Sequence, residues 1–470
     1  MPLPSFLRSF LAWILCVRRP LPTWSEPERL EYQRRHLKHN VFVNVAEGAF
    51  WWVGMGFAPA ATVMPLFISK LTPSAWPVGL LGALANSGWL LPQLFTSNFV
   101  ERLAQKKPIV VYLGALTERV PVIFFPLAAL LAPRHPQWAL ALFLTAYAWH
   151  KLGSGLIATA WQDMLANCFP LNVRSWLLAG MVVIGAGIAL ACAEPCARLL
   201  ETLVFPYNFV VCFAVCAFGV LMSGAILIFT REPVDPVLKP RQSHREFARE
   251  LPQHLRTDRS LRYALAARVL ATCGLMSVAF LTVSAVQRWD LPDRSAAMYT
   301  GWMMAGQMLG NLACATISSR WGHKLTLGLG WLLSAVAFIL AAMAPAPTWI
   351  YPVFLLVGMT SGFDFISAML LVMELAQPER RATYTGLVNT SVGVVGLFSP
   401  LVGSVLVAWS PSALMSLSAG FYLLAALTLW RGVDEPRRRL ERQAFRVPGA
   451  AAEQEDGAEG EPVEREREHE

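Results

Sequence analysis

Charged residues are scarce in this chain of 470 residues. Asp, Glu, Lys and Arg make up 15% of the sequence, whereas hydrophobic residues make up 55% and the mean hydropathy is +0.46. Charge at this density cannot cover the surfaces of several soluble domains. Disorder over most of the chain is also excluded, because 26 Phe, 17 Trp and 9 Tyr supply more apolar area than a solvated coil carries.

Several patterns typical of soluble chemistry are also missing from the sequence. It has no G-x-x-x-x-G-K-[ST] loop, and its glycine-rich runs lie in apolar segments without a following strand, so it predicts neither direct ATP use nor a dinucleotide site. The eight cysteines form neither a disulfide framework nor a zinc-ligand pattern. No nucleophile, base and orienting group cluster together. We therefore expect no catalytic residue, no metal, no cofactor and no enzyme activity.

Long apolar runs are abundant instead. A helix needs about 20 mainly apolar residues to cross a bilayer core, and twelve such runs occur. Alternating ten-residue strands are absent, so we predict an all-α polytopic membrane protein with twelve transmembrane helices in two six-helix bundles. The predicted spans are residues 44–67, 78–100, 108–131, 138–160, 175–193, 209–229, 263–286, 297–318, 325–344, 349–373, 383–409 and 413–430.

Three polar stretches divide the chain around these spans. Residues 1–39 form an N-terminal segment, in which the short apolar run 10–17 predicts an interfacial helix and Ser25 to Glu28 is typical of a capping box. Residues 230–260 form a linker between a bundle at 40–229 and a bundle at 261–432. Residues 433–470 form a tail rich in Arg and Glu, which we predict to be disordered.

The net charge of +8 has a topological explanation. Of the 39 Lys and Arg residues, 31 fall on the predicted side that holds both termini and the linker, 5 fall on the other side and 3 lie within spans. This asymmetry predicts cytoplasmic termini and a cytoplasmic linker in a multi-pass protein of the cell (plasma or inner) membrane. Because the asymmetry accounts for the excess charge, we expect no nucleic-acid partner.

An internal repeat relates the two halves of the sequence. Sliding the second half onto the first by 218 residues aligns the second predicted span and its loop with the eighth. The aligned pairs are Gly88 and Gly306, Leu91 and Leu309, Gln93 and Asn311, Leu94 and Leu312, Arg102 and Arg320, and Lys106 and Lys324. The two basic pairs carry most weight, since both fall at the same place in a predicted cytoplasmic loop.

Twelve spans in two halves of six, joined by a long cytoplasmic linker, resemble the major facilitator superfamily. The segment Ser319 to Lys324, which reads Ser-Arg-Trp-Gly-His-Lys, is similar to the Asp-Arg-x-Gly-Arg-Arg loop of that family. Its first-half counterpart, Glu101 to Lys107, has Ala104 where the family has glycine. The resemblance implies two loops that latch one conformation by setting bases against acids or helix ends of the neighbouring bundle. The latch residues are Glu101, Arg102, Lys106, Arg320, Gly322 and Lys324.

No subfamily follows from this resemblance. The fifth span has glycines without the Gly-Pro motif typical of the family's drug antiporters. The family relationship therefore implies a secondary transporter and leaves the substrate, the direction and the coupling ion unassigned.

Ionisable residues inside the predicted spans are the main candidates for function, because each costs about 2.5 to 3.5 kcal/mol at the bilayer centre. They are Glu47, Glu118, Arg119, His150, Lys151, Arg268 and Asp364. One hypothesis makes Glu118 a proton-coupling acid whose charge is offset by Lys151 or Arg119. The alternative is a static ion pair that ties the third and fourth helices together.

Other span residues could line a solute cavity. Glu47 is either a snorkelling acid near the membrane interface or a cavity acid, because the first and seventh helices of the resembled family line the cavity and Arg268 lies at a comparable depth. Asp364 could bind a cation or the solute, or could be a structural acid. The spacing of Asn86, Trp89 and Gln93 predicts a shared helix face. The cavity candidates are Glu47, Trp89, Gln93, Glu118, Arg119, Lys151, Arg268, Asn311 and Asp364.

The function predicted from these features is secondary active transport of a small solute by alternating access, with protons as a coupling partner under the Glu118 hypothesis. We expect a monomer in the lipid bilayer. The alternative is a transporter-like sensor, lipid scramblase or scaffold without solute flux, whose basic segments dock anionic lipid or another protein.

Overall fold

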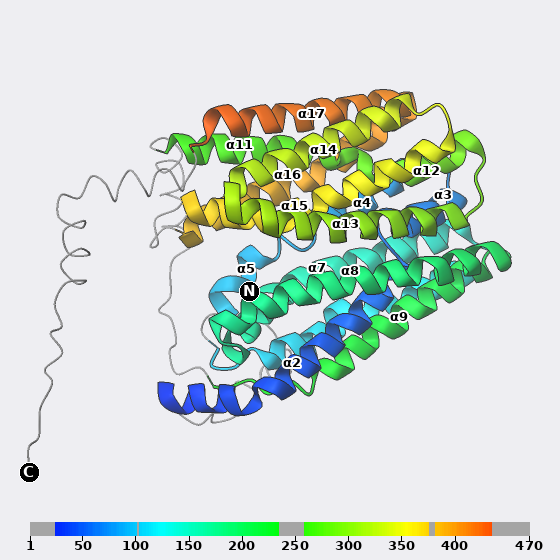
Figure 1. The fold of residues 1–470 in the computed structure, drawn as a ribbon. Coiled ribbons are helices and arrows are strands. Elements are labelled where there is room, and N and C mark those ends of the chain that lie inside the picture. Colours follow the sequence, from blue (N-terminus) through cyan, green and yellow to red (C-terminus); the bar gives the residue numbers. More distant parts are fainter. Residues whose placement is uncertain (1–23, 101–102, 235–257, 376–380, 435–470) are drawn as a thin grey trace, which may run out of the picture.

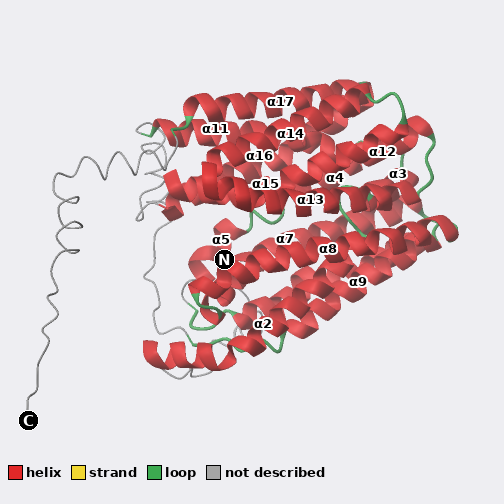
Figure 2. Cartoon of the chain, viewed as in Figure 1, coloured by secondary structure: helices red, strands yellow, loops and turns green. Residues whose placement is uncertain are grey.

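A computed structural model describes residues 24–100, 103–234, 258–375 and 381–434 of the chain. All regular secondary structure in these ranges is helical. Figure 2 shows helices and loops in these ranges, and none of their residues lies in a strand. The predicted interfacial helix at 10–17, most of the linker and nearly all of the tail lie outside the described residues. The all-α prediction is confirmed.

The first half of the chain contains α2 to α9, and the second half contains α11 to α17. First-half elements are α2 (Glu26–Phe57), α3 (Val63–Leu71), α4 (Trp76–Ser87), α5 (Gln93–Val100), the short segments η1 (Ile109–Leu113), η2 (Ala115–Arg119) and η3 (Val120–Ile123), α6 (Phe124–Leu131), α7 (Pro136–Cys168), α8 (Leu171–Thr202) and α9 (Tyr207–Leu227). Second-half elements are α11 (Arg259–Gly274), η4 (Leu275–Ser277), α12 (Val278–Trp289), α13 (Arg294–Trp321), α14 (His323–Met343), η5 (Pro347–Trp349), α15 (Ile350–Leu375), α16 (Arg381–Trp409) and α17 (Pro411–Gly432).

Four predicted spans are broken helices. A turn containing Pro59 separates α2 from α3, and a turn ending at Pro92 separates α4 from α5. The third predicted span is not a single α-helix, because η1 and η2 have wider, π-type turns and η3, which contains Pro121, is a 3-10 segment. Proline lacks the N–H that would continue the ladder of helical hydrogen bonds, which explains the breaks beside it. In the seventh predicted span, η4 interrupts α11 and α12.

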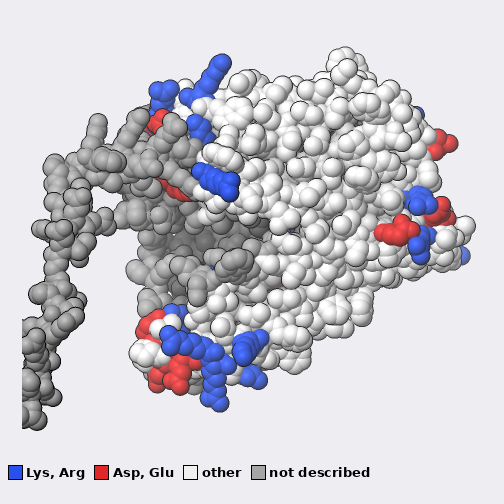
Figure 3. Space-filling view, in the orientation of Figure 1, with Lys and Arg blue, Asp and Glu red and all other residues white. Residues whose placement is uncertain are grey.

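Seven helical stretches among the described residues are long and apolar enough to cross a membrane. They are Ile109–Leu131, Gly180–Thr202, Tyr207–Leu227, Arg259–Trp289, His323–Met343, Leu387–Trp409 and Pro411–Gly432. Figure 3 shows charged side chains at two opposite ends of the visible face and a belt without charge between them. This distribution is typical of a protein whose middle lies in lipid.

The helices of the two halves form separate groups. In Figure 1, α2, α7, α8 and α9 lie below, whereas α11, α13, α14, α15 and α17 lie above. A core of buried side chains around Trp331, Phe338 and Phe354 joins the second-half helices to one another. A larger core around Phe67, Phe143 and Phe213 joins the first-half helices and extends to Phe280 of the second half.

The beginning of α2 confirms the predicted capping box. The carboxylate of Glu28 accepts hydrogen bonds from the backbone N–H of Ser25 at 2.7 Å and from its hydroxyl at 2.8 Å. These contacts lower the pKa of the exposed Glu28 carboxyl below its usual value. The helix then continues without interruption to Phe57, so the polar segment and the start of the first predicted span form one element.

Candidate functional site

An ion pair between Arg268 and Asp364 lies midway along the second half. The guanidinium Nη1 of Arg268, on α11, donates to Oδ1 of Asp364, on α15, at 2.6 Å. Trp331 of α14 donates its indole N–H to the same oxygen at 3.2 Å. The side chain of Asp364 is 34% exposed and that of Arg268 is 16% exposed. A carboxylate that is held on one side and open on the other can accept a ligand without first losing its partners.

The helices around this pair are held closely together. On α15, the hydroxyl of Thr360 donates to the carbonyl of Gly330 on α14 at 2.7 Å, and Ser334 donates to Thr360 at 3.0 Å. Glycines allow the close crossing of α13 and α15, because a Cβ at Gly306 would meet the carbonyl oxygen of Leu355. Asp364 is therefore positioned by a rigid packing of three helices.

A second cluster of charge lies inside the first half. Arg119 of η2 donates from Nη1 to Oε2 of the adjacent Glu118 at 2.7 Å, and its Nη2 lies 4.0 Å from Oε1 of Glu47 on α2. The hydroxyl of Ser223, on α9, donates to the same oxygen of Glu47 at 2.7 Å. Glu47, Glu118 and Arg119 are only 6%, 4% and 5% exposed. We call Glu47, Glu118, Arg119 and Ser223 the sealed cluster.

Small residues leave room for the long arginine side chain in this cluster. A Cβ at Gly224 of α9 would collide with Cδ of Arg119, and one at Gly114 would lie 2.9 Å from its Nη1. His150 of α7 donates its Nδ1–H to the carbonyl oxygen of Glu118 at 2.6 Å, and its ring stacks on Trp51. These contacts fix the irregular backbone of η2, a kind of distortion that is common at functional positions.

The sealed cluster bears on the alternatives considered for Glu47 and Glu118. Glu47 is not a snorkelling acid at the interface, because the packing of α2 against α9 encloses it and Ser223 satisfies it. Among the described contacts, the ion-pair partner of Glu118 is Arg119, and Lys151 lies half-buried against Gly88. Sequence spacing could not find Ser223, which lies more than a hundred residues away on another helix.

The polar residues of the second predicted span do not share one helical face. Asn86 lies in α4 and Gln93 begins α5, while Trp89 lies in the turn between them. The side-chain amide of Gln93 donates to the carbonyl of Trp89 at 2.7 Å. The predicted face is therefore wrong, because Pro92 ends the regular helix. Asn311, which the repeat aligns with Gln93, is buried on α13, and both polar atoms of its side chain have no partner among the described residues.

The first predicted latch loop is anchored by an acid that the sequence analysis missed. Glu232, just after α9, accepts hydrogen bonds from the backbone N–H of Lys106 at 2.9 Å and of Lys107 at 2.7 Å. Asn167 donates to it at 3.4 Å. Burial raises the pKa of Glu232, and the two backbone N–H groups partly oppose that rise. Glu101 and Arg102 lie outside the described residues.

The second predicted latch loop connects α13 to α14. Gly322 adopts a positive φ of 86° between the helices, which favours glycine. Lys324 donates from Nζ to the carbonyl of Trp430 at 3.1 Å, near the end of α17, and Arg320 is exposed. The described contacts of both loops thus lie within their own half. The expected contacts with the neighbouring bundle remain a prediction.

Polar contacts join the two halves at one end of the molecule, which we call the distal end; the proximal end holds the start of α2 and the end of α17. Lys70 pairs with Asp293 at 2.7 Å, and Glu201 pairs with Arg294 at 2.7 Å. The hydroxyl of Thr282 donates to the carbonyl of Ala61 at 3.1 Å. Partly exposed ion pairs add little stability, but these pairs join the ends of α3 and α8 in the first half to the start of α13 in the second half. The contacts therefore mark a closed distal end.

Comparison with known proteins gives the class of protein that this fold and site define. The sequence model of the Major Facilitator Superfamily matches residues 289–459. A comparison with curated protein sequences gave no match. The resemblance predicted from the loop motif and the repeat is confirmed in the second half, where the motif is closest to the family pattern.

Solved transporter structures share the fold of the chain. The nucleoside transporter NupG matches with a TM-score of 0.63 and 14% identity, covering 84% of this chain and all of its own. A POT family transporter in complex with 5-aminolevulinic acid matches with a TM-score of 0.65 and 12% identity over 84% of this chain and 95% of its own. The xylose transporter XylE from E. coli, in a partially occluded inward-open conformation, matches with a TM-score of 0.62 and 11% identity. The match covers 85% of this chain and 98% of XylE. The chain has a major facilitator superfamily fold, with no subfamily assigned.

Proposed function

We propose that the protein is a secondary active transporter that moves a small solute across the cell membrane by alternating access. Its twelve predicted spans would form two six-helix bundles, at 40–229 and 261–432, that rock around a site near the bilayer midplane. The observation that carries this proposal is the partly exposed pair of Arg268 and Asp364, which contrasts with the sealed cluster of the first half. Deep, accessible charge is costly in a membrane and is typical of a solute or ion pathway.

The arrangement of the halves supports an inward-facing state. The excess of Lys and Arg in the predicted proximal loops places that end in the cytoplasm, so the closed distal end would face outside. The polar contacts of Lys70 and Glu201 across the halves hold the outer gate shut in this state. The similarity to XylE, whose structure is described as inward-open, agrees with this assignment.

Within this proposal the two charge clusters have different roles. Asp364 receives the solute or a coupling cation, because its carboxylate is the most exposed acid within the predicted spans. Arg268 and Trp331 position it. Glu118, whose charge is matched by Arg119, acts as part of a static framework, which is the alternative to the proton-coupling hypothesis for that residue.

The test is solute flux by the purified full-length protein in proteoliposomes. Candidate solutes are first chosen by thermal shift from nucleosides, pentoses, amino acids and short peptides, since binding to the native state raises apparent stability. Uptake by wild type and loss of uptake in Asp364→Asn support the proposal. Glu194→Gln is the matched control, because Glu194 is an exposed acid at the surface in a pair with Arg198.

The same preparation separates transport from the alternative functions. A dye sensitive to pH inside the vesicles reports proton movement when solute is added. Lipid scrambling without any solute flux would support a scramblase instead. The absence of both solute flux and scrambling, in a protein that binds a solute, would support a sensor.

A further inference from the structure

The first turns of α2 extend beyond the apolar part of the first half. At about 1.5 Å per residue, a helix of 32 residues is longer than the hydrocarbon core of about 30 Å. Figure 1 shows these turns, in dark blue, projecting past the other helices of their group. The polar residues 26–39 therefore lie where the apolar core of a bilayer gives way to headgroups.

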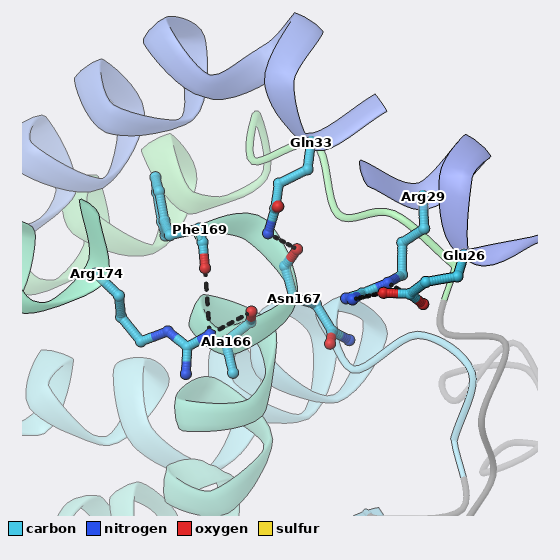
Figure 4. A network of polar contacts seen from close by, with 7 residues as sticks. All are labelled: Glu26, Arg29, Gln33, Ala166, Asn167, Phe169 and Arg174. Carbon is cyan, nitrogen blue, oxygen red and sulfur yellow. Dashed lines mark hydrogen bonds and ion pairs between the residues drawn. The ribbon is translucent and has the colours of Figure 1, made fainter. Parts of the chain in front are cut away.

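One face of this segment is fixed against the protein. Gln33 is 4% exposed, and its side-chain amide donates to the carbonyl of Asn167 at 3.0 Å, as Figure 4 shows. Asn40 is fully buried and exchanges two hydrogen bonds of 2.9 Å with the backbone of Arg231. The rotation of the helix about its axis is thus set by two buried amides.

The opposite face carries bases between two apolar side chains. Its exposed residues include Leu30, Arg34, Arg35, Lys38 and Phe42, which we call the basic stripe, together with the acid Glu31 one turn before the two arginines. Leu30, Arg34, Lys38 and Phe42 recur every four residues and so follow one line along the helix. Phe42 is 75% exposed and Leu30 is 39% exposed. Lys38 lies one turn before the exposed Phe42. A base before an aromatic residue is the order expected where a helix passes from headgroups into hydrocarbon.

The bases of the stripe have no acid partner among the described residues, a property that they share with other exposed bases such as Arg134 and Arg288. Arg34, Arg35 and Lys38 form no ion pair with the described residues. By contrast, Arg29 pairs with Glu26, as Figure 4 shows, and Arg198 pairs with Glu194. Exposed bases on a face that continues an apolar surface are in position to contact lipid phosphates.

We propose that the basic stripe docks the headgroups of anionic phospholipids in the membrane leaflet at the proximal end. The guanidinium groups of Arg34 and Arg35 and the ammonium of Lys38 contact lipid phosphates, while Phe42 and Leu30 reach the acyl boundary. This contact holds the entry of the first transmembrane helix at a defined depth. It does not depend on which solute the protein carries.

The experiment measures lipid binding by the purified full-length protein in neutral detergent. Phosphatidylglycerol is added, with phosphatidylcholine as the zwitterionic control and glycerol phosphate as the source of free phosphate. Bound lipid is counted by native mass spectrometry, and the thermal midpoint is followed in parallel. We expect wild type to retain phosphatidylglycerol, to show no response to glycerol phosphate, and to lose the lipid as salt concentration rises.

The decisive variant replaces all three bases of the stripe, Arg34→Gln, Arg35→Gln and Lys38→Gln. Its apparent affinity for phosphatidylglycerol should fall at least about tenfold, since each base near an anionic surface contributes on the order of several-fold. The matched control replaces three exposed distal bases, Arg134→Gln, Arg198→Gln and Arg288→Gln, and should bind like wild type.

Three results would overturn the proposal. One is equal phosphatidylglycerol binding by wild type and the stripe variant, and another is an equal loss in the control variant, which would indicate general charge attraction. The third is binding in wild type that does not weaken with salt, a result that stands even if the stripe variant misfolds. The thermal midpoint without lipid shows whether the stripe variant is folded, because these side chains are exposed.

Discussion

Each half of the molecule contains charged residues midway along its helices, but the two sets differ in access to solvent. In the first half, Glu47, Glu118 and Arg119 are all at most 6% exposed, and Arg119 lies within ion-pair distance of both acids. In the second half, Asp364 is 34% exposed although Arg268 and Trp331 hold it. The comparison teaches that charge within a span can be closed off from solvent or open to it, and that only the open kind is in position to meet a solute.

Chemistry explains why the sealed cluster suits a structural role. A buried carboxylate without a counter-charge is costly, so two acids around one arginine make that arginine indispensable to folding. The second-half pair is simpler, with one acid, one base and one indole donor. Its open side exposes the carboxylate to solvent, which lowers the cost of disturbing it.

The largest expected effect is a loss of folding stability when the arginine of the sealed cluster or of the Arg268–Asp364 pair is replaced. Arg119→Leu should destabilise the protein by about 3 to 5 kcal/mol, because it leaves two buried carboxylates without their partner. Arg268→Leu should cost clearly less, since Asp364 remains partly solvated. Thermal unfolding of both variants in the same detergent compares them. Equal losses would break the distinction between a sealed and an open cluster.

The next largest effect is a loss of transport when the acid of the Arg268–Asp364 pair is neutralised. Asp364→Asn should lower solute flux at least about tenfold, equivalent to roughly 1.4 kcal/mol, while the thermal midpoint changes little because the amide oxygen can still accept from Arg268 and Trp331. Trp331→Phe, which removes a neutral donor and some buried ring volume, is the comparison variant and should have a smaller effect on flux. Undiminished flux in Asp364→Asn would move the solute site away from this pair.

A smaller effect is expected from the acid of the sealed cluster. Glu118→Gln should keep solute flux within about twofold of wild type and should preserve any dependence of flux on a proton gradient, because Glu118 is matched by Arg119 and shielded from solvent. Flux under imposed pH gradients in proteoliposomes measures this. Loss of the gradient dependence with binding intact would restore Glu118 as the coupling acid.

The sequence predicted the class of fold from features that repeat along the chain. Long apolar runs, the asymmetry of Lys and Arg, and the loop from Ser319 to Lys324 each depend only on local composition. It also selected Arg268 and Asp364, because charge within an apolar run is visible without a structure. Their pairing, and the difference in exposure between the two clusters, depends on helix rotation, which composition does not determine.

Residues that satisfy those charges were harder to find. Ser223, Trp331 and Asn167 are ordinary span or helix-end residues until another helix brings a charge to them. Irregular backbone was missed for a related reason, since the prolines at 59, 92 and 121 end regular hydrogen bonding within runs that hydropathy treats as continuous. Glu232 was counted as part of the linker because it follows the sixth apolar run directly.

The smallest expected effect concerns the two predicted latch loops at the proximal end. The buried Glu232 holds the loop of the first half, whereas Lys324 holds the loop of the second half. Burial raises the pKa of Glu232 above its usual value, so the folded state holds the proton more tightly than the unfolded chain does. The stabilising contribution of this proton is complete below the unfolded pKa and is lost as pH rises through the raised pKa. Wild type should therefore lose thermal stability relative to Glu232→Gln as the pH rises from the ordinary pKa of a carboxyl group through the raised pKa of Glu232. Thermal midpoints across that range, with Glu194→Gln as an exposed-acid control, measure the slope. Parallel curves for wild type and Glu232→Gln would mean that the backbone N–H groups of Lys106 and Lys107 fully offset the burial of this acid.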